Sequence, residues 1–238
     1  MLTGVFAALL ILGGAGWLLI DAGSTPPGVP NEADTADLNR MRNRQPLHSF
    51  PRDGKEWPGW RADPDPSHKW DTDDEGAYCC RRFNQFEKFA TLSIKDHKLQ
   101  KAFACEVKGR ATGEGSKWGL MIGEDTGDRW RGILVFLSPG DSKVGVDPPF
   151  RWLGNNFPAR IGTFKPPAVK RSDDADTLTV IFRDDEFKVY VNDRAVLDAL
   201  DFPEAKNPSH FALMAFGPNP NKDAWVGFSR FRLWEIDD

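Results

Sequence analysis

The run Asp71–Gly76 (DTDDEG) places acidic side chains at the spacing of a calcium-binding loop. Asp71, Asp73 and Glu75 stand at positions 1, 3 and 5 of the run, and glycine stands at position 6. EF-hand loops offer carboxylate oxygens to Ca²⁺ in this pattern, together with a glutamate at position 12. Position 12 is Arg82 here, which excludes an EF-hand. We therefore predict a looser metal site at Asp71, Asp73 and Glu75, with calcium as the ion and an exposed acidic turn as the alternative.

Tryptophan is the second chemical signal, because eight of the nine tryptophans lie beyond residue 50. A flat aromatic ring docks on the C–H face of a sugar, while a nearby amide or carboxylate orients the sugar hydroxyls. Trp130 in the run DRWRG, and Trp152 ahead of Asn155 and Asn156, are flanked by turn-forming residues. These four residues are the predicted ligand-binding residues. Packing in the core is the alternative for each tryptophan.

A retaining glycosidase needs two carboxyl groups about 5–5.5 Å apart. The E-x-D triplet Glu235–Asp237 lies at the end of the chain and is interpreted as a solvated terminus. Glu124, Asp125 and Asp128 cluster in a predicted loop, where turn composition also explains them. The sequence holds no G-x-S-x-G, H-E-x-x-H or phosphate-loop motif. No catalytic residue is predicted.

The three cysteines leave two interpretations open. Cys79 and Cys80 are adjacent and Cys105 stands alone, so one disulfide would leave an odd thiol. Burial as small apolar thiols is the simpler interpretation, since free cysteine is often buried. A zinc site is disfavoured because there is no C-x-x-C pair and the four histidines are scattered.

Strands must position these residues, and the segment Thr177–Ala199 shows them most clearly. Leu178, Val180 and Phe182 alternate with Thr177, Thr179 and Ile181, and the alternation resumes over residues 187–191. A period of two places one set of side chains on each face of a strand. The polar runs RDDE and NDR that follow are typical of tight turns. The segment predicts an antiparallel meander.

Further strand patterns are separated by Gly, Pro, Asp or Asn. They span Lys101–Ala111, Lys117–Glu124, Trp130–Ser138, His210–Gly217 and Trp225–Ile236. In the last of them Ser229 and Arg230 interrupt the alternation, which predicts a bulge. Many short strands with such punctuation indicate an all-β fold, an antiparallel jelly-roll β-sandwich over residues 46–238.

Residues 1–20 carry no charged side chain. As a helix they would span about 30 Å, the thickness of the bilayer hydrocarbon. We expect a transmembrane helix that anchors the chain, with a cleaved signal peptide as the alternative. No Lys or Arg precedes the apolar run, and the AGS site at residues 22–24 is a mediocre cleavage site. The domain is predicted to be membrane-anchored and extracytoplasmic, or secreted if residues 1–20 are removed.

Residues 21–45 are predicted to form a linker that opens with prolines and glycines. Within it, Asn31–Arg44 has acids early and arginines late, which suits a short exposed helix, and disorder is the alternative. Leu38 and Met41 are its only large apolar residues, so no core-facing side is expected. The three arginines weakly favour a cytoplasmic side, whereas sandwich domains of this kind more often face outward.

Composition bounds the function. The chain is 40% hydrophobic and 12% aromatic, which supports a folded core. Its net charge of −4 offers no basic footprint, so nucleic acid is not a predicted partner.

Three stretches resemble concanavalin A-like jelly rolls, namely Trp118–Asp125 (WGLMIGED), Val189–Arg194 (VYVNDR) and Val226–Glu235 (VGFSRFRLWE). The chain is similar in particular to the laminin G-like and bacterial 3-keto-disaccharide hydrolase (DUF1080-type) branches. The resemblance implies the jelly-roll fold, together with glycan binding, glycoside cleavage or a place as the outer domain of an envelope protein. The asparagine-serine-glycine stretch of the hydrolase branch is not found, and Lys117–Leu120 stands in the comparable place. No catalytic residue is carried over.

The sequence thus predicts a membrane-tethered, non-catalytic β-sandwich that binds a glycan or a cell-envelope partner. Two alternatives stay open. One is a glycoside-cleaving enzyme of the 3-keto-disaccharide hydrolase type, and the other is a purely structural protein-interaction domain.

Overall fold

The structure is a computed structural model. The described residues are 35–62, 69–81, 88–93, 102–113, 115–125, 130–147, 162–164, 174–183, 186–201, 208, 210–217 and 225–236.

Within these ranges the chain forms an α-helix, a short 3-10 helix at Pro139–Asp141 and a succession of strands. The helix α1 spans Thr35–Arg42. The strands are β1 (His48–Phe50), β2 (Trp60–Ala62), β3 (Lys69–Thr72), β4 (Tyr78–Arg81), β5 (Lys88–Ser93), β6 (Phe103–Thr112), β7 (Lys117–Asp125), β8 (Trp130–Ser138), β9 (Lys143–Asp147), β10 (Gly162–Phe164), β11 (Asp176–Arg183), β12 (Glu186–Val191), β13 (Arg194–Asp201), β14 (His210–Phe216) and β15 (Trp225–Glu235).

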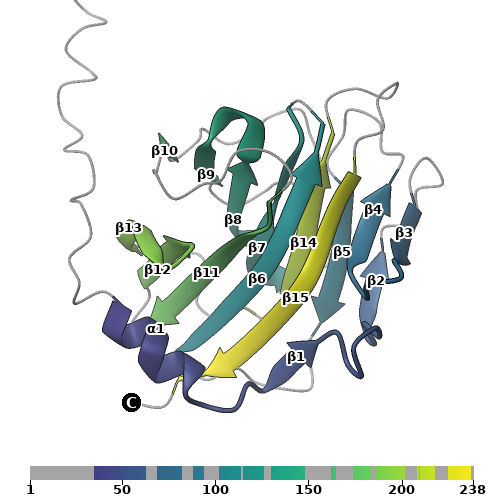
Figure 1. Cartoon of the computed structure of the whole chain (residues 1–238). Helices are drawn as coiled ribbons and strands as arrows, with labels where there is room; N and C mark the ends of the chain where they lie inside the picture. Colours follow the sequence, from purple (N-terminus) through teal and green to yellow (C-terminus); the bar gives the residue numbers. More distant parts are fainter. Residues whose placement is uncertain are drawn as a thin grey trace, which may run out of the picture.

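The strands pair antiparallel in two sheets that lie face to face (Figure 1). Sheet 1 has the order β13-β12-β11-β6-β15-β4-β3, and β1 pairs with the second half of β15. Sheet 2 has the order β10-β9-β8-β7-β14-β5-β2. The last strand, β15, lies between β6 and β4, so segments far apart in the sequence meet in the middle of sheet 1. The predicted all-β antiparallel sandwich is confirmed.

The core lies between the sheets and is built by strand alternation. On β11, Leu178, Val180 and Phe182 face it, and on β7 Trp118 and Ile122 face it from the opposite sheet. Each of these side chains is at most 2% exposed. Burial of one such side chain contributes about 1.5–3 kcal/mol. The strands predicted from period-two patterns coincide closely with β6, β7, β8, β11, β12, β14 and β15.

The helix α1 lies across the outer face of sheet 1 (Figure 1), which corrects the expectation of an exposed helix without a core-facing side. Leu38 and Met41 are 1% and 3% exposed. They are three residues apart, on one side of the helix, and pack with Ile181 and Trp234 from the sheet. The indole Nε1 of Trp234 also donates to the backbone oxygen of Arg44 at 3.1 Å. The helix is therefore tied to the sandwich.

Two local predictions on turns and bulges are confirmed. Asn192 and Asp193 have φ of 49° and 67°, the left-handed pair that a two-residue hairpin turn between β12 and β13 requires. The pairing of β15 with β6 shifts register between Phe228 and Arg230. The extra residue of this bulge is Ser229, which is exposed.

The predicted anchor, residues 1–20, lies outside the described residues. Among the residues that are described, no helix is long and apolar enough to cross a membrane.

Candidate functional site

The outer faces of the two sheets differ in chemistry. On sheet 2, an apolar cluster covers the outer side of β7, β8 and β14, formed by Met121, Leu134, Phe136, Ala212 and Met214. At its edge the ammonium of Lys117 lies 5.3 Å from the ring centroid of Phe136 and 4.9 Å from that of Phe216. The outer face of sheet 1 is instead rich in charged side chains.

Of the tryptophans with described side chains, two lie on this face: Trp234, which α1 covers, and Trp225, which α1 leaves uncovered. Apart from Trp225, the tryptophans with described side chains belong to or pack against a buried cluster: Trp57, Trp60, Trp70, Trp118 and Trp234. Trp225 is half-buried and opens β15 on the outer face of sheet 1. Its neighbours Val226 and Phe228 are fully buried and face the core, so alternation places Trp225 and Gly227 outside.

Trp225 lies flat against the sheet. A Cβ on Gly227 would fall 2.4 Å from Cζ3 of the indole, so the ring covers the Gly227 backbone in a way that glycine alone permits. The guanidinium carbon of Arg110 lies 4.6 Å from the ring centroid, a cation–π contact. The backbone N–H of Trp225 donates to Oγ1 of Thr112 at 3.2 Å. We call the Trp225 ring and the Arg110 guanidinium the tryptophan stack.

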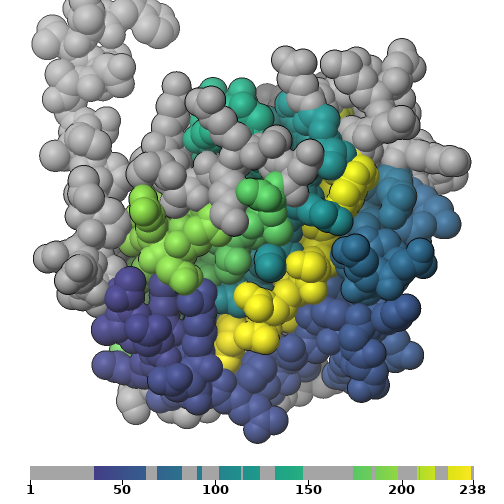
Figure 2. Space-filling view, in the orientation of Figure 1, coloured from purple at the N-terminus to yellow at the C-terminus, as the bar shows by residue number. Residues whose placement is uncertain are grey.

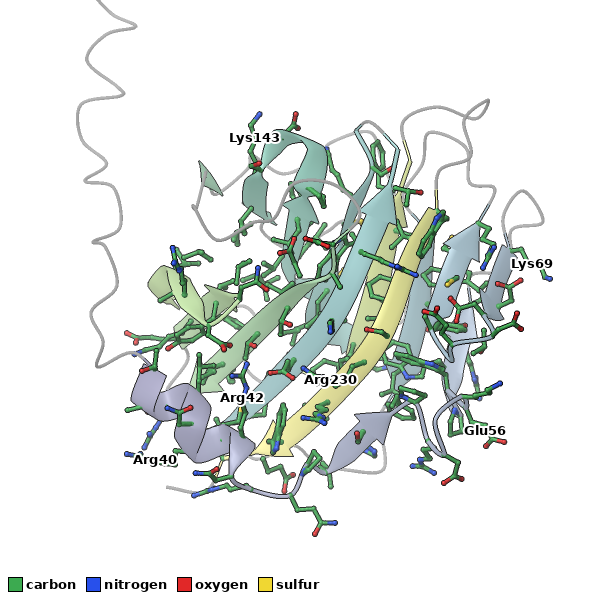
Figure 3. The ribbon with its side chains drawn as sticks, viewed as in Figure 1. Arg40, Arg42, Glu56, Lys69, Lys143 and Arg230 are labelled. Atoms are coloured by element: carbon green, nitrogen blue, oxygen red, sulfur yellow. The ribbon has the colours of Figure 1, made fainter. Side chains whose placement is uncertain are left out.

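Ion pairs surround the tryptophan stack. Arg81 pairs with Trp225 in the register of β4 and β15. On β3, Asp71 receives Nζ of Lys69 at 2.9 Å and Nε of Arg81 at 3.5 Å. Figure 3 shows Lys69 at the free edge of the sheet. Surface pairs of this kind are worth about 0–1 kcal/mol, so their members are available to the hydroxyls of a ligand.

The predicted calcium ligands lie near the tryptophan stack. Each of them already forms an ion pair or hydrogen bonds within the chain. Asp71 binds the two cations of β3 and β4. Oδ1 of Asp73 accepts the backbone N–H groups of Glu75 at 3.0 Å and Ala77 at 2.8 Å, which shapes the turn between β3 and β4. Glu75 is 83% exposed and lies 3.9 Å from Arg110. Within the described ranges, no three or more His, Cys, Asp or Glu side chains group as a metal site.

A buried carboxylate lies farther along the same face. Glu106 of β6 is 1% exposed, and its Oε2 accepts Nε and Nη2 of Arg42 at 3.0 and 2.8 Å. Nη2 of Arg230 lies 2.9 Å from the other oxygen. Arg42 also donates to Asp193 at 2.6 Å, and the bonds to Asp193 and Glu106 hold the pKa of Arg42 above its usual range. Figure 3 shows Arg42 and Arg230 over the sheet. This network fastens α1 to the sandwich.

An open pocket of about 300 Å³ lies where α1 meets β11 and β12. Its lining is a mixture of charges around one isoleucine: Asp37, Ile181, Arg183, Glu186 and Lys188. The lining holds no Ser, Cys or His, so it offers no nucleophile with an adjacent base.

The three cysteines are free and buried, as the simpler interpretation expected. Burial raises the pKa of Cys79 to about 12, and the neighbouring Asp73 carboxylate acts in the same direction. Burial likewise raises the pKa of Cys105. Because the thiolate is the reactive form, these thiols are not suited to nucleophilic chemistry.

None of the four ligand-binding residues predicted from sequence has a described side chain. Trp152, Asn155 and Asn156 lie outside the described residues. Trp130 begins β8 opposite Asp125, and the structure describes its backbone alone. Our sequence interpretation ranked tryptophans by flanking turn residues and so missed Trp225. The signal that identifies it is the alternation W-V-G-F, which places this ring opposite the core-facing residues.

No family model and no curated protein matches the chain. Solved structures match it in fold. The carbohydrate recognition domain of Emp46p, in its metal-free form, has a TM-score of 0.59 at 12% identity and covers 80% of this chain and 97% of that chain. Its potassium-bound form has a TM-score of 0.54 at 13% identity, covering 79% and 94%.

A carbohydrate-binding module and a catalytic domain match similarly. CBM66 from Bacillus subtilis has a TM-score of 0.51 at 19% identity and covers 71% of this chain and 91% of that chain. The catalytic domain of a laminarinase, an endo-1,3-beta-glucanase from Thermotoga petrophila, has a TM-score of 0.58 at 14% identity, covering 82% and 98%. At these identities the likeness shows the fold alone. The fold of this chain is the concanavalin A-like jelly roll that the sequence resembled.

Proposed function

We propose that this protein is a non-catalytic glycan-binding module, held at a membrane by residues 1–20 with its sandwich outside the cytoplasm. The observation that carries the glycan-binding part is the tryptophan stack on the outer face of sheet 1. The exposed part of the Trp225 ring and the Arg110 guanidinium packed over it offer a sugar a flat surface together with hydrogen-bond donors. The carbohydrate-recognition and carbohydrate-binding domains among the similar folds support the same class of ligand.

The tryptophan stack is held in place by the pairing of its strands. Trp225 and Arg110 stand on two neighbouring strands of sheet 1. Backbone pairing with β4 and β6 holds Trp225 on both sides, and pairing with β15 holds Arg110 on one. Sites built on strands hold their groups more precisely than sites built on loops. Asp71 and Arg81 supply an acceptor and a donor at the border, which suits the mixed hydrogen bonding of sugar hydroxyls.

The test is a glycan array probed with the full chain and with Trp225→Ala. We expect reproducible binding by the full chain and at least about a tenfold loss in the variant, about 1.4 kcal/mol. Trp225→Phe is the matched control, because it keeps an aromatic ring and should retain part of the affinity. Equal binding by the full chain and Trp225→Ala would remove the stack from the proposal. Trp130→Ala and Trp152→Ala test the ligand-binding residues predicted from sequence in the same assay.

The second candidate function is a glycoside-cleaving enzyme, and the laminarinase catalytic domain among the similar folds is the observation that favours it. Incubation of bound glycans with the protein distinguishes the two functions, since an enzyme releases shorter products. Calcium at Asp71, Asp73 and Glu75 stays a prediction, and arrays run with calcium and with chelator test it. If no glycan on the array is bound with calcium or with chelator, a protein or envelope partner is favoured instead.

Membrane tethering rests on the apolar sequence of residues 1–20. We expect the full chain to fractionate with membranes and to be released by detergent, and we expect its sandwich to be open to protease added outside the cell. Recovery in the soluble fraction with an intact N-terminus would contradict tethering.

A further inference from the structure

Cations form a row along the outer face of sheet 1 beside the tryptophan stack. Lys108 and Arg110 come from β6, and Arg230 and Arg232 come from β15. We call these four residues the cation strip. The bulge at Ser229 creates the strip, since unbroken alternation from the core-facing Val226 and Phe228 would have turned positions 230 and 232 inward. The register shift sends them to the face that carries Trp225.

The strip is electrostatically incomplete. Lys108 and Arg230 are direct partners in the register of β6 and β15, and like charges in that position destabilise a sheet. Among the described residues, no ion pair joins Lys108 or Arg232 to an acid. Within the part of the chain that the structure describes, the Nε atoms of Arg230 and Arg232 and the Oε1 atom of Glu106 are buried and have no hydrogen-bond partner. An unsatisfied buried donor costs about 1–3 kcal/mol.

Glu106 neutralises only part of the strip. Its Oε2 accepts two hydrogen bonds from Arg42 of α1, and its Oε1 lies 2.9 Å from Nη2 of Arg230. On this part of the face four cations, Arg42, Lys108, Arg230 and Arg232, stand with the two acids Glu106 and Asp193, in a chain whose net charge is −4. The fourth member of the strip, Arg110, lies 3.9 Å from Glu75. The positive charge of this face is therefore local.

We propose that the cation strip binds the anionic groups of an acidic glycan, carboxylate or sulfate, whose sugar ring meets the tryptophan stack. The proposal rests on the proposed glycan-binding function and names its ligand class. The side chains of Arg230 and Arg232 are partly exposed. Charge-assisted bonds from their guanidinium groups to the oxygens of a carboxylate or sulfate are roughly twice as strong as neutral ones. The bound anion also relieves the repulsion between Lys108 and Arg230.

Dimensions favour a chain over a single sugar. Trp225 and Arg232 lie seven residues apart on β15, which corresponds to about 20 Å along a strand that rises roughly 3.3 Å per residue. Figure 2 shows β15 (yellow) in view between α1 (purple) on one side and β3 and β4 (blue) on the other. An extended polyanion running along β15 would meet the stack first and the strip after it.

The experiment measures the affinity of the full chain for dextran, for dextran sulfate of the same length and for oligogalacturonate, at several salt concentrations. We expect the two acidic probes to bind at least tenfold more tightly than dextran at low salt, with affinity that falls as salt rises. Lys108→Gln is the informative variant, since no ion pair joins Lys108 to any acid that the structure describes. It should lower affinity for the acidic probes about fivefold and leave dextran binding unchanged. Arg40→Gln, on the exposed side of α1, is the matched control and should change neither.

Each contrary result points to a different part of the account. Equal affinity for dextran and both acidic probes, with Trp225→Ala still abolishing binding, would overturn the cation strip and leave the glycan-binding function. Tight acidic binding that Trp225→Ala does not weaken would overturn the joint site. Binding of none of the three probes would overturn the strip, while the array decides on the stack. A single-stranded oligonucleotide that competes as well as the acidic glycans would overturn the assignment of a glycan as the occupant.

Discussion

Replacing Arg42 by alanine removes the contact that fastens α1 to the sandwich. In the native protein Arg42 donates two bonds to Glu106, which is 1% exposed, and one to Asp193, which is 54% exposed. In the variant, Glu106 keeps Arg230 as its partner, but one of its oxygens loses both guanidinium donors. We expect a clear loss of stability.

The magnitude follows from these contacts. Breaking a buried pair by removing one partner costs about 3–5 kcal/mol, and an exposed pair such as Arg42–Asp193 adds at most about 1 kcal/mol. Arg42 itself is 29% exposed and Glu106 retains Arg230, so water and the second guanidinium offset part of the loss. We therefore expect about 2–4 kcal/mol, which shifts the urea midpoint by about 1 M when the urea m-value is roughly 3 kcal/mol/M.

The assay is equilibrium unfolding in urea, with Arg40→Ala as the matched control. Arg40 lies on the same helix and is exposed, and Figure 3 shows it directed away from the sheet. The control should stay within about 0.5 kcal/mol of the native protein. In a double-mutant cycle, Arg42→Ala and Glu106→Ala should couple by about 1–3 kcal/mol. If Arg42→Ala were as stable as the Arg40→Ala control, the contacts of Arg42 with Glu106 and Asp193 would not stabilise the fold.

The remaining predictions concern a glycine, a turn, and the buried thiol and phenol of Cys79 and Tyr78. Gly109→Ala should lower stability by about 1–3 kcal/mol, because the new Cβ would lie 2.9 Å from the fully buried Trp118 ring. Asp73→Ala should lower stability by about 1–2 kcal/mol, because two backbone N–H groups lose their acceptor. Burial raises the pKa of both Cys79 and Tyr78 to about 12, whereas unfolded Cys and Tyr ionise near 8.5 and 10. Unfolding therefore releases protons at high pH, and the thermal midpoint should fall as pH rises from about 9 to 12.

Each of these has its control. Gly140→Ala should be tolerated, since the nearest atom to a Cβ there is 3.8 Å away; equal losses at both glycines would contradict the steric argument. Asp74→Ala, at an exposed position of the same turn, should cost less than Asp73→Ala when both are measured by urea unfolding. A thermal midpoint that is flat between pH 9 and 12, or rapid labelling of Cys79 by a thiol reagent in the native state, would contradict the burial of these groups.

Long strands with one core face were predictable from sequence. On β11 and β12 the apolar residues Leu178, Val180, Val189 and Val191 alternate in the sequence, and all four face the core. Short strands were harder to predict. In β4, for example, both Cys79 and Cys80 are buried, so the strand shows no alternation of apolar and polar residues. Cys80 faces the core, whereas Cys79 lies on the outer face beside Gly227. A strand buried on both faces cannot be distinguished from other apolar runs by periodicity.

The position of the candidate site was not predictable from sequence. Tryptophans and clustered acids suggested polar recognition, which stays a prediction, but which tryptophan faces outward depends on β15 pairing with β4 and β6. The packing of α1 was hidden for a similar reason. Leu38 and Met41 are too few for an amphipathic pattern, yet two residues suffice once the sheet supplies Ile181 as a partner.

The central claim is that the outer face of sheet 1, at Trp225, binds a glycan. The most direct measurement is the glycan array probed in parallel with the full chain, Trp225→Ala and Trp225→Phe, after matched thermal midpoints show that all three are folded. We expect the full chain to bind, the phenylalanine variant to bind more weakly, and the alanine variant to lose at least about tenfold in affinity. Undiminished binding by folded Trp225→Ala would contradict the central claim.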